Sequence, residues 1–501
     1  MKNSYIFTKE ASILIKSAKE YPESHTVITL SPLDHLTQRF AFGCIFVYPS
    51  KIDIETLKKS LSEVLADYPL LCGSLSSVND KLRVTLDNIG VTFIVSTSTS
   101  RLSNPINIDE LPDYDQVITR IDLTSTIGQA SSKSGVTFQI TQFACGSVII
   151  GFCVLHCLVD GGSMFEFMLA WANMANPAHP FTLSKPLYSR DIVFSLATFP
   201  SKIPHPEYSF KDLDLNRTHQ LESEQNSAGH TTPPHPPHSS NSRTALHRAE
   251  GTTEKLCPNS SNPLTSQLPS SKVSKTYSFT DQAISQMKVE AFAPNGDKKL
   301  STNDLLSAHL ARCITRARHF PDSKNIRVVL GVNSRSRLAP PLKNYFGNLV
   351  IHTANFFQVK DLLEQPLGTI ASHIRSSVDK IDDVFIRDEL AFLEENIHRL
   401  RNLNLDSLRV LGHSESSVFI SNWSKFPMYS IDFGGGGPTY VGIPHTPATQ
   451  LSSQSSDGIC FILPSSGKEG GVDVWLYLRQ DHLEKMENDE EWKRYCKPDT
   501  S

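Results

Sequence analysis

Residues 147–162 read SVIIGFCVLHCLVDGG and pass from an apolar run through a short turn to two glycines. The first nine residues have the length and composition of a buried strand, and apolar residues recur at helical spacing from 164 to 172. We therefore expect a strand, a turn and an amphipathic helix in succession. Ser163 and Glu166 have capping-box spacing at the start of this helix, so Ser163 is expected to be its N-cap.

The expected turn carries His156 and Asp160. Histidine titrates near neutral pH, so its neutral ring can accept a proton from an attacking hydroxyl and later release it. Asp160 can fold back to fix the turn or bind a distant arginine, and Gly161 permits the bend. The alternative is a structural histidine that bonds the backbone at a strand end. Cys157 is interpreted as a small buried hydrophobe rather than a nucleophile.

The rest of the chain mixes helical and strand patterns. Apolar residues recur at helical spacing from 54 to 65, and Pro69 is expected to stop that helix. Ser301 and Asp304 precede a second amphipathic helix, and residues 472–478 alternate as a strand does. A chain of 501 residues is too long for one core, so we predict an α/β fold with two domains.

A segment rich in Ser, Pro, Thr, Asn and His separates the two predicted domains. It lacks periodic apolar residues, so burial cannot offset its ordering entropy. We predict an N-terminal domain over 1–205, a disordered linker or loop over 206–275 and a C-terminal domain over 276–501. Flexible tracts of this kind seldom bind metal, and we expect no metal site, including at the linker histidines His230, His235 and His238.

Composition and charge exclude several classes of function. The net charge is -4 and no basic stripe marks a nucleic-acid surface. Nine cysteines are scattered without metal-ligand spacing, which is typical of reduced thiols. The N-terminus has no apolar signal core, and the longest apolar run is too short to cross a bilayer. We expect a soluble cytoplasmic protein that binds neither nucleic acid nor membranes.

Several short motifs in a fixed order resemble those of the BAHD acyltransferase family, which has plant and fungal members. The family carries H-x-x-x-D-G in mid-chain and D-F-G-W-G near the C-terminus. The matching stretches of this chain cover residues 28 to 487 apart from the linker, and they are Leu30–Asp34, Leu57–Leu75, His156–Gly161, Asn333–Leu338, Tyr345–Asn348, Ser421–Trp423 and Asp432–Gly436.

The resemblance implies two chloramphenicol-acetyltransferase-like domains, each a mixed sheet with helices, that form a channel where they meet. Acyl-coenzyme A would be a co-substrate, with no permanently bound cofactor, and the enzyme would be a monomer. His156 would deprotonate the acceptor, which attacks the thioester directly. Asp160 would be structural and pair with Arg335, or failing that with Arg337. Removing one partner of a buried pair costs ~3–5 kcal/mol.

Further site residues follow from the resemblance. Asn348 and the backbone near Gly435 would donate to the oxyanion, and His35 could line the acceptor pocket. Asp432, Gly434 and Gly436 would support the channel, although Gly435 replaces the family's tryptophan. Small polar and basic groups of the second domain, namely Ser301, Thr302, Arg335 and Lys425, would contact coenzyme A.

The resemblance favours transfer of an acyl group to a hydroxyl or amine of a small secondary-metabolite-type acceptor. Acetyl is the acyl group expected by default. One alternative is a condensation-domain-like transferase that uses carrier-protein thioesters. Such domains usually have a second histidine before the motif, where this chain has Leu155. A non-catalytic relative is another alternative. A serine hydrolase is disfavoured because the chain has no G-x-S-x-G sequence.

Overall fold

A computed structural model describes most of the chain. The described residues are 5–19, 26–38, 40–79, 81–104, 106–122, 134–178, 184–208, 271–291, 300–401, 416–444, 457–465, 467 and 470–496. Most of the expected linker, including His230, His235 and His238, lies outside these ranges. Within them, no helix has both the length and the apolar character that crossing a bilayer requires.

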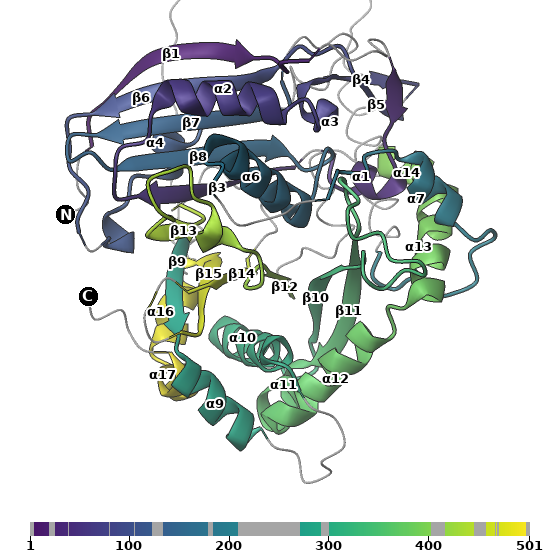
Figure 1. Ribbon diagram of the computed structural model, residues 1–501. Coiled ribbons are helices and arrows are strands. Elements are labelled where there is room, and N and C mark those ends of the chain that lie inside the picture. Colours follow the sequence, from purple (N-terminus) through teal and green to yellow (C-terminus); the bar gives the residue numbers. More distant parts are fainter. Residues whose placement is uncertain are drawn as a thin grey trace, which may run out of the picture. The chain divides into compact units, whose positions relative to one another are not determined.

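The first half of the described chain forms a mixed six-stranded sheet (Figure 1). Its strands, in spatial order, are β1 (Phe7–Ile15), β6 (Val91–Ser98), β7 (Val136–Phe143), β8 (Val148–Leu155), β3 (Ala41–Tyr48) and β13 (Tyr440–Gly442). β6 and β7 run parallel, and the other neighbours are antiparallel. β8 is buried along its whole length, as its apolar sequence predicts.

Two amphipathic helices, α2 (Ile54–Val64) and α6 (Gly161–Ala175), contact each other over this sheet (Figure 1). A small second sheet holds β2 (Val27–Thr29), β5 (Lys81–Thr85) and β4 (Ser74–Val78). The short helices of this half are α1 (Pro32–Leu36), α3 (Pro69–Cys72), the 3-10 turn Ile108–Glu110, α4 (Tyr114–Val117) and α7 (Asp191–Leu196).

The second half builds another mixed six-stranded sheet. Its strands, in spatial order, are β11 (Val350–Gln358), β10 (Asn325–Asn333), β12 (Ser417–Asn422), β14 (Ile459–Pro464), β15 (Val472–Arg479) and β9 (Lys272–Phe279). β12 pairs in parallel with both β10 and β14. β9 already begins at Lys272, before the expected domain boundary at 276.

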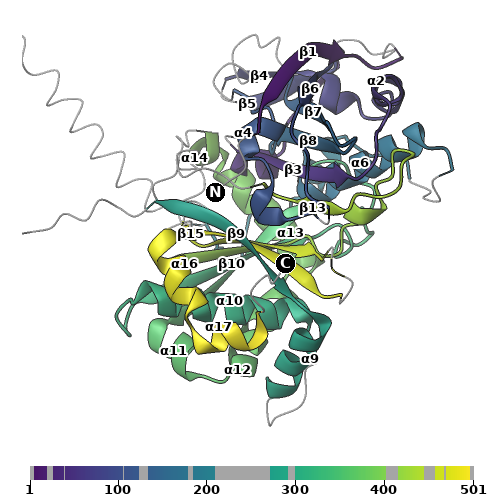
Figure 2. The same ribbon diagram turned by 90° about the vertical axis from the view of Figure 1, so that its left-hand side faces the viewer.

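Helices gather on the face of this sheet that points away from the first sheet (Figure 2). They are α9 (Asp281–Glu290), α10 (Thr302–Arg318), α11 (Val359–Glu364), α12 (Leu367–Asp379), α16 (Gln480–Glu487) and α17 (Glu490–Tyr495). Two more, α13 (Asp383–Glu395) and α14 (Ile397–Arg401), contact α1 of the first half.

The two halves share a core because the chain crosses back. β13, from the second half of the sequence, pairs antiparallel with β3 at the edge of the first sheet. Aromatic residues of the second half, including Trp423, Phe433 and Trp475, belong to the hydrophobic cluster of the first half. Burial of such large side chains contributes strongly to stability. The pairing of β13 with β3 and the shared aromatic cluster hold the second half of the chain against the first, next to His156.

Sequence predictions of element boundaries are partly correct. The capping box of Ser301 and Asp304 is present at the start of α10. The predicted capping box of Ser163 and Glu166 is wrong, because Asp160 is the N-cap and α6 begins at Gly161. A cap needs an acceptor before the first turn, and the Asp160 carboxylate supplies it by accepting from the Ser163 N–H. α2 ends at Val64, and Pro69 opens α3 instead of stopping α2.

Candidate active site

His156 is the first residue after β8 and is only half-buried. Its main-chain N–H donates to the Phe40 carbonyl at 2.8 Å, which continues the pairing between neighbouring strands for one more residue. The imidazole packs against Phe42 and Phe40, with ring centroids 4.9 and 5.7 Å away. These contacts fix the ring at the end of the buried strand.

One imidazole nitrogen of His156 has a defined partner. Its Nδ1 lies 3.1 Å from Oδ1 of Asn348. The Asn348 amide nitrogen donates to Oδ1 of Asp34 at 2.8 Å and to the His156 carbonyl at 2.7 Å, and both partners can only accept. This identifies the atom that faces His156 as the amide oxygen, which cannot donate. Nδ1 must therefore carry the proton, and Nε2 keeps its lone pair.

Asn348 is itself held by a buried ion pair. Asp34 and Arg190 are 0% and 1% exposed in their side chains, and Arg190 Nε donates to Asp34 Oδ2 at 3.0 Å. The other Arg190 nitrogens donate to main-chain carbonyls, including those of Leu158 and Phe346. Sequence analysis matched Asp34 only as part of a motif and missed Arg190, since nothing near that residue signals a buried arginine.

Asp160 joins the turn to the second half of the chain. Its carboxylate accepts from the Ser163 N–H at 2.9 Å and from the Leu349 N–H at 3.0 Å. Arg335 approaches both oxygens, with Nη2–Oδ1 at 3.0 Å and Nη1–Oδ2 at 2.9 Å. The structure thus pairs Asp160 with Arg335, whereas Arg337 donates to the carbonyls of Val378 and Ile381.

Residues 345–349 dock directly on this turn. The Gly347 carbonyl accepts from Arg335 Nη2 at 2.8 Å and from the Ser163 hydroxyl at 3.1 Å. Arg335 Nε donates to the Tyr345 carbonyl at 2.9 Å. The Y-F-G-N stretch and the H-x-x-x-D-G stretch, nearly 200 residues apart in sequence, therefore form one hydrogen-bonded unit.

Burial and charge set the ionisation of the two motif residues. Burial lowers the pKa of His156, and the negative charge of Asp160 offsets only part of that effect. Burial alone would raise the pKa of Asp160, but the Arg335 guanidinium, together with the N–H groups of Ser163 and Leu349, outweighs it and holds that pKa below its usual value. The site therefore contains a neutral imidazole near an ionised carboxylate. Burial raises the pKa of the Cys157 thiol, which disfavours a nucleophilic role.

A cavity of about 190 Å³ opens onto His156. Both halves of the chain line it, including Asp160, Gly161 and Asn348. Most of its wall is aromatic or aliphatic, from Leu33, Leu36, Phe40, Phe42, Phe419, Trp423, Phe426, Ile443, Phe461 and Trp475. A largely apolar cavity with a few convergent polar groups is the usual form of a small-molecule site.

Asn348 cannot fill the oxyanion role expected of it. Its two amide protons are already donated to Asp34 and to the His156 carbonyl, so neither is left for a reacting oxygen. Gly435 is exposed and is not among the cavity-lining residues, so its backbone N–H is not placed to donate to the oxyanion either. His35 is 1% exposed and does not line the cavity either.

The structure does not bring the expected coenzyme A contacts into the cavity wall. The Ser301 hydroxyl donates to Asp304 at 2.7 Å as part of the helix cap, so it has a structural partner. Thr302 is the first residue of α10 and is not among the lining residues. Lys425 is exposed on the turn between Trp423 and Phe426, two residues that do line the cavity.

The D-F-G-G-G loop lies away from His156 and has its own framework. Asp432 Oδ1 accepts from the N–H groups of Gly434 and Gly436 at 2.7 and 2.9 Å. Both glycines have positive φ, +103° and +93°, which side-chain-bearing residues rarely adopt. At Gly435 a Cβ would lie 2.8 Å from the Ser50 Oγ, whose hydroxyl donates to the Gly435 carbonyl at 3.0 Å.

Comparisons with known proteins agree with this geometry. The model described as Transferase family matches residues 6–493. Hydroxycinnamoyltransferase 1 of Oryza sativa subsp. japonica is 25% identical, with 96% of this chain and 98% of that protein covered. Anthranilate N-benzoyltransferase protein 1 of Dianthus caryophyllus is 24% identical, with 94% and 96% covered.

The fold also has solved counterparts. The F. graminearum TRI101 structure complexed with coenzyme A and deoxynivalenol matches with a TM-score of 0.65. The two sequences are 16% identical, and the match covers 94% of this chain and 99% of that chain. At this identity the likeness supports the two-sheet fold.

Proposed function

The chain belongs to the Transferase family of BAHD acyltransferases, which use acyl-coenzyme A as co-substrate, and from that premise we propose that His156 is its general base. The acceptor is a hydroxyl or amine of a small molecule held in the apolar cavity. The observation that carries the proposal is the orientation of the Asn348 amide. Its oxygen faces Nδ1 of His156, so the ring proton is on Nδ1 and the Nε2 lone pair is available to the acceptor.

The reaction then follows in two proton transfers. Nε2 takes the proton from the acceptor as its oxygen or nitrogen attacks the thioester carbon. The tetrahedral intermediate collapses, the carbon–sulfur bond breaks, and the imidazolium returns the proton to the departing thiolate. Asp160 stays ionised against Arg335 throughout and fixes the turn.

The oxyanion needs a donor other than Asn348. We propose the Trp423 indole, which lines the cavity and whose Nε1 lies 3.4 Å from where a Cβ on Gly161 would stand. An indole N–H donates only, so it suits a developing negative charge. Lys425, exposed beside this tryptophan, is proposed to contact the phosphates of the donor.

The acyl group is proposed to be acetyl and its acceptor an alcohol of a secondary metabolite. A second candidate is an aromatic acyl group, because aromatic rings dominate the cavity wall and the similar enzymes are named for hydroxycinnamoyl and benzoyl transfer. The protein is proposed to act as a cytoplasmic monomer with an N-terminal domain over 1–205 and a C-terminal domain that begins with β9 at Lys272, not at the expected residue 276.

A donor panel tests the proposal. Acetyl-, benzoyl- and p-coumaroyl-coenzyme A are incubated with a library of alcohols and amines, and free thiol release and the products are measured. We expect acceptor-dependent thiol release with at least one donor, and no such release with the His156→Ala variant. Turnover only with a carrier-protein thioester would favour the condensation-type alternative. Donor binding without turnover on any acceptor would favour a non-catalytic relative.

A further inference from the structure

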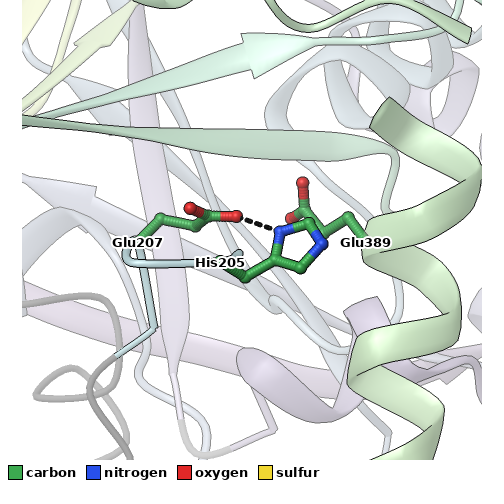
Figure 3. A group of neighbouring side chains, drawn as sticks. All are labelled: His205, Glu207 and Glu389. Carbon is green, nitrogen blue, oxygen red and sulfur yellow. Dashed lines mark hydrogen bonds and ion pairs between the residues drawn. The ribbon is translucent and has the colours of Figure 1, made fainter. Parts of the chain in front are cut away.

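A second cluster of ligand-type side chains lies outside the cavity. His205 and Glu207 stand on the segment after α7, and Glu389 stands on α13. One nitrogen or oxygen from each of the three side chains lies within 4.8 Å of the others. Figure 3 shows the carboxylates of Glu207 and Glu389 converging on the His205 ring.

These side chains are buried, and one oxygen among them has no partner. The exposed fractions of His205, Glu207 and Glu389 are 6%, 3% and 0%. Oε1 of Glu389 accepts from the Tyr208 hydroxyl, whereas Oε2 has no hydrogen-bond partner among the described residues. A buried carboxylate oxygen without a donor is costly and requires either a proton or a cation.

A third acid orients the histidine. Nε2 of His205 lies 3.0 Å from Oδ1 of Asp388. The same oxygen accepts from the Ser201 hydroxyl and the Ile203 N–H, and Oδ2 accepts from the Lys202 N–H. A carboxylate on one nitrogen of a histidine directs the lone pair of the other nitrogen to a metal ion. In this cluster that other nitrogen is Nδ1, which faces Oε1 of Glu207.

The net negative charge of the cluster matches a divalent cation. Three carboxylates, from Glu207, Asp388 and Glu389, are gathered around a neutral or protonated His205. Arg327 contributes one positive charge where its Nη2 donates to the Glu207 carbonyl. With His205 neutral, two positive charges are needed to balance the remainder, which one divalent cation supplies.

We propose that His205, Glu207 and Glu389 bind a structural Zn²⁺ ion. Imidazole and carboxylate ligands suit zinc, with bonds of ~2.0–2.2 Å, so two ligand atoms on one ion lie at most ~4.4 Å apart. The ligand atoms now lie within 4.8 Å of one another, so the widest pair must approach by a few tenths of an ångström. The ion would also replace the direct hydrogen bond between Nδ1 of His205 and Oε1 of Glu207, and these two atoms must move apart to admit it. The ion would link residues 201–208 to α13. Because the cluster is buried, a substrate could not reach the ion. No spacing motif in the sequence predicts this site.

Metal content and stability test the proposal on the full-length, tag-free protein. The protein is stripped with a chelator, dialysed against Zn²⁺, and measured by elemental analysis and thermal unfolding. We expect one strongly bound Zn²⁺ that raises Tm by ~2 °C or more in excess metal. Co²⁺ in its place should give visible absorption from a low-coordinate site.

Two variants separate this site from metal bound elsewhere. Glu389→Gln keeps the shape of the side chain but removes a ligand charge, and we expect at least ~10-fold weaker binding and loss of the Zn²⁺-dependent rise in Tm. Glu394→Gln, the same change further along α13, should bind like the wild type. Absence of a bound equivalent, or equal binding by wild type and Glu389→Gln, would overturn the proposal. A metal-free cluster with a proton on Glu389 would give one of these two results.

Discussion

The negative charges of nearby acids act on both His156 and His205, yet the pKa of the first is lowered and that of the second is raised. His156 has one nitrogen on a neutral amide oxygen, and burial lowers its pKa. His205 has both nitrogens on carboxylates, Glu207 and Asp388, and these outweigh burial and raise its pKa. The first environment preserves a lone pair for chemistry, and the second favours a positive charge on or beside the ring.

The comparison shows that nearby acids alone do not make a histidine a base. At His156 the carboxylate with the largest effect is Asp160, which is paired with Arg335. Its charge raises the pKa of the ring but does not offset burial. At His205 the carboxylates contact the ring directly. Substitutions at the two sites should therefore separate activity from stability.

The largest expected effect is on turnover. His156→Ala should lower kcat by ~10²–10⁴ while coenzyme A binding survives, because only the proton acceptor is lost. Steady-state kinetics and calorimetric titration measure the two quantities. His205→Gln is the matched control, and it should lower Tm while leaving kcat largely unchanged. Near-normal turnover of His156→Ala would contradict the assignment of His156 as the general base.

The ion pair next to His156 should dominate stability. Asp160→Asn leaves the Arg335 guanidinium buried without its counter-charge, which costs ~3–5 kcal/mol of unfolding free energy, and misplaces the turn so that activity falls as well. Urea unfolding and kinetics measure both. Asp383→Asn breaks the more exposed pair with Arg387 and should cost no more than ~1 kcal/mol. Lost activity with unchanged stability would instead indicate a chemical role for Asp160.

Substitution of Asn348 tests whether its amide fixes the tautomer of His156. Asn348→Ala removes the acceptor on Nδ1 of His156 and leaves Asp34 short of a donor. A lost buried hydrogen bond costs ~1–3 kcal/mol, which corresponds to a fall of about 5- to 150-fold in kcat/KM. Asn344→Ala, which loses one exposed contact to the Lys185 carbonyl, is the control. Equal activity in both variants would argue against tautomer control.

A smaller effect is expected in the glycine loop. Gly434→Ala forces a side chain onto a backbone with φ of +103° and should destabilise the protein by ~1–2 kcal/mol. Gly435→Ala meets only the Ser50 hydroxyl, which can rotate away, so its cost should stay below ~0.5 kcal/mol. Thermal unfolding distinguishes them, and equal losses would mean that the loop is not fixed by glycine conformation.

The smallest effect is a displaced pH profile. Because burial lowers the pKa of His156, the neutral base should persist below the usual histidine value of 6.5. The value of kcat/KM should therefore rise with pH and reach half its plateau below pH 6.5. In Asn348→Ala the midpoint should fall further, since the hydrogen bond that Nδ1 of His156 donates to Asn348 raises the pKa of His156. A midpoint above 7 in the wild type would contradict this environment.

Much of the fold could be predicted from sequence because its signals are local. The apolar run of β8, the helix at 54–65 and the Ser301 cap each depend on neighbouring residues. The pairing of Asp160 with Arg335 was accessible only through the family's motif order, since the two residues are 175 positions apart. β13 is too short to carry a pattern, so its crossing to the first sheet was missed.

The remaining parts of the site depend on contacts that no motif records. Asn348 was correctly selected but assigned the wrong role, because the use of its two protons is visible only with Asp34 and the His156 carbonyl in place. Arg190 lies 156 residues from Asp34. The cluster around His205 likewise joins residues more than 180 positions apart, with no ligand spacing in the sequence.

The tautomer of His156 can be observed directly. Long-range nitrogen–proton correlation on protein labelled with ¹⁵N-histidine, assigned by comparison with His156→Gln, reports which ring nitrogen carries the proton at each pH. The account predicts a neutral ring protonated at Nδ1 from pH 8 down to below 6.5. A ring protonated at Nε2, or at both nitrogens at pH 7, would contradict it.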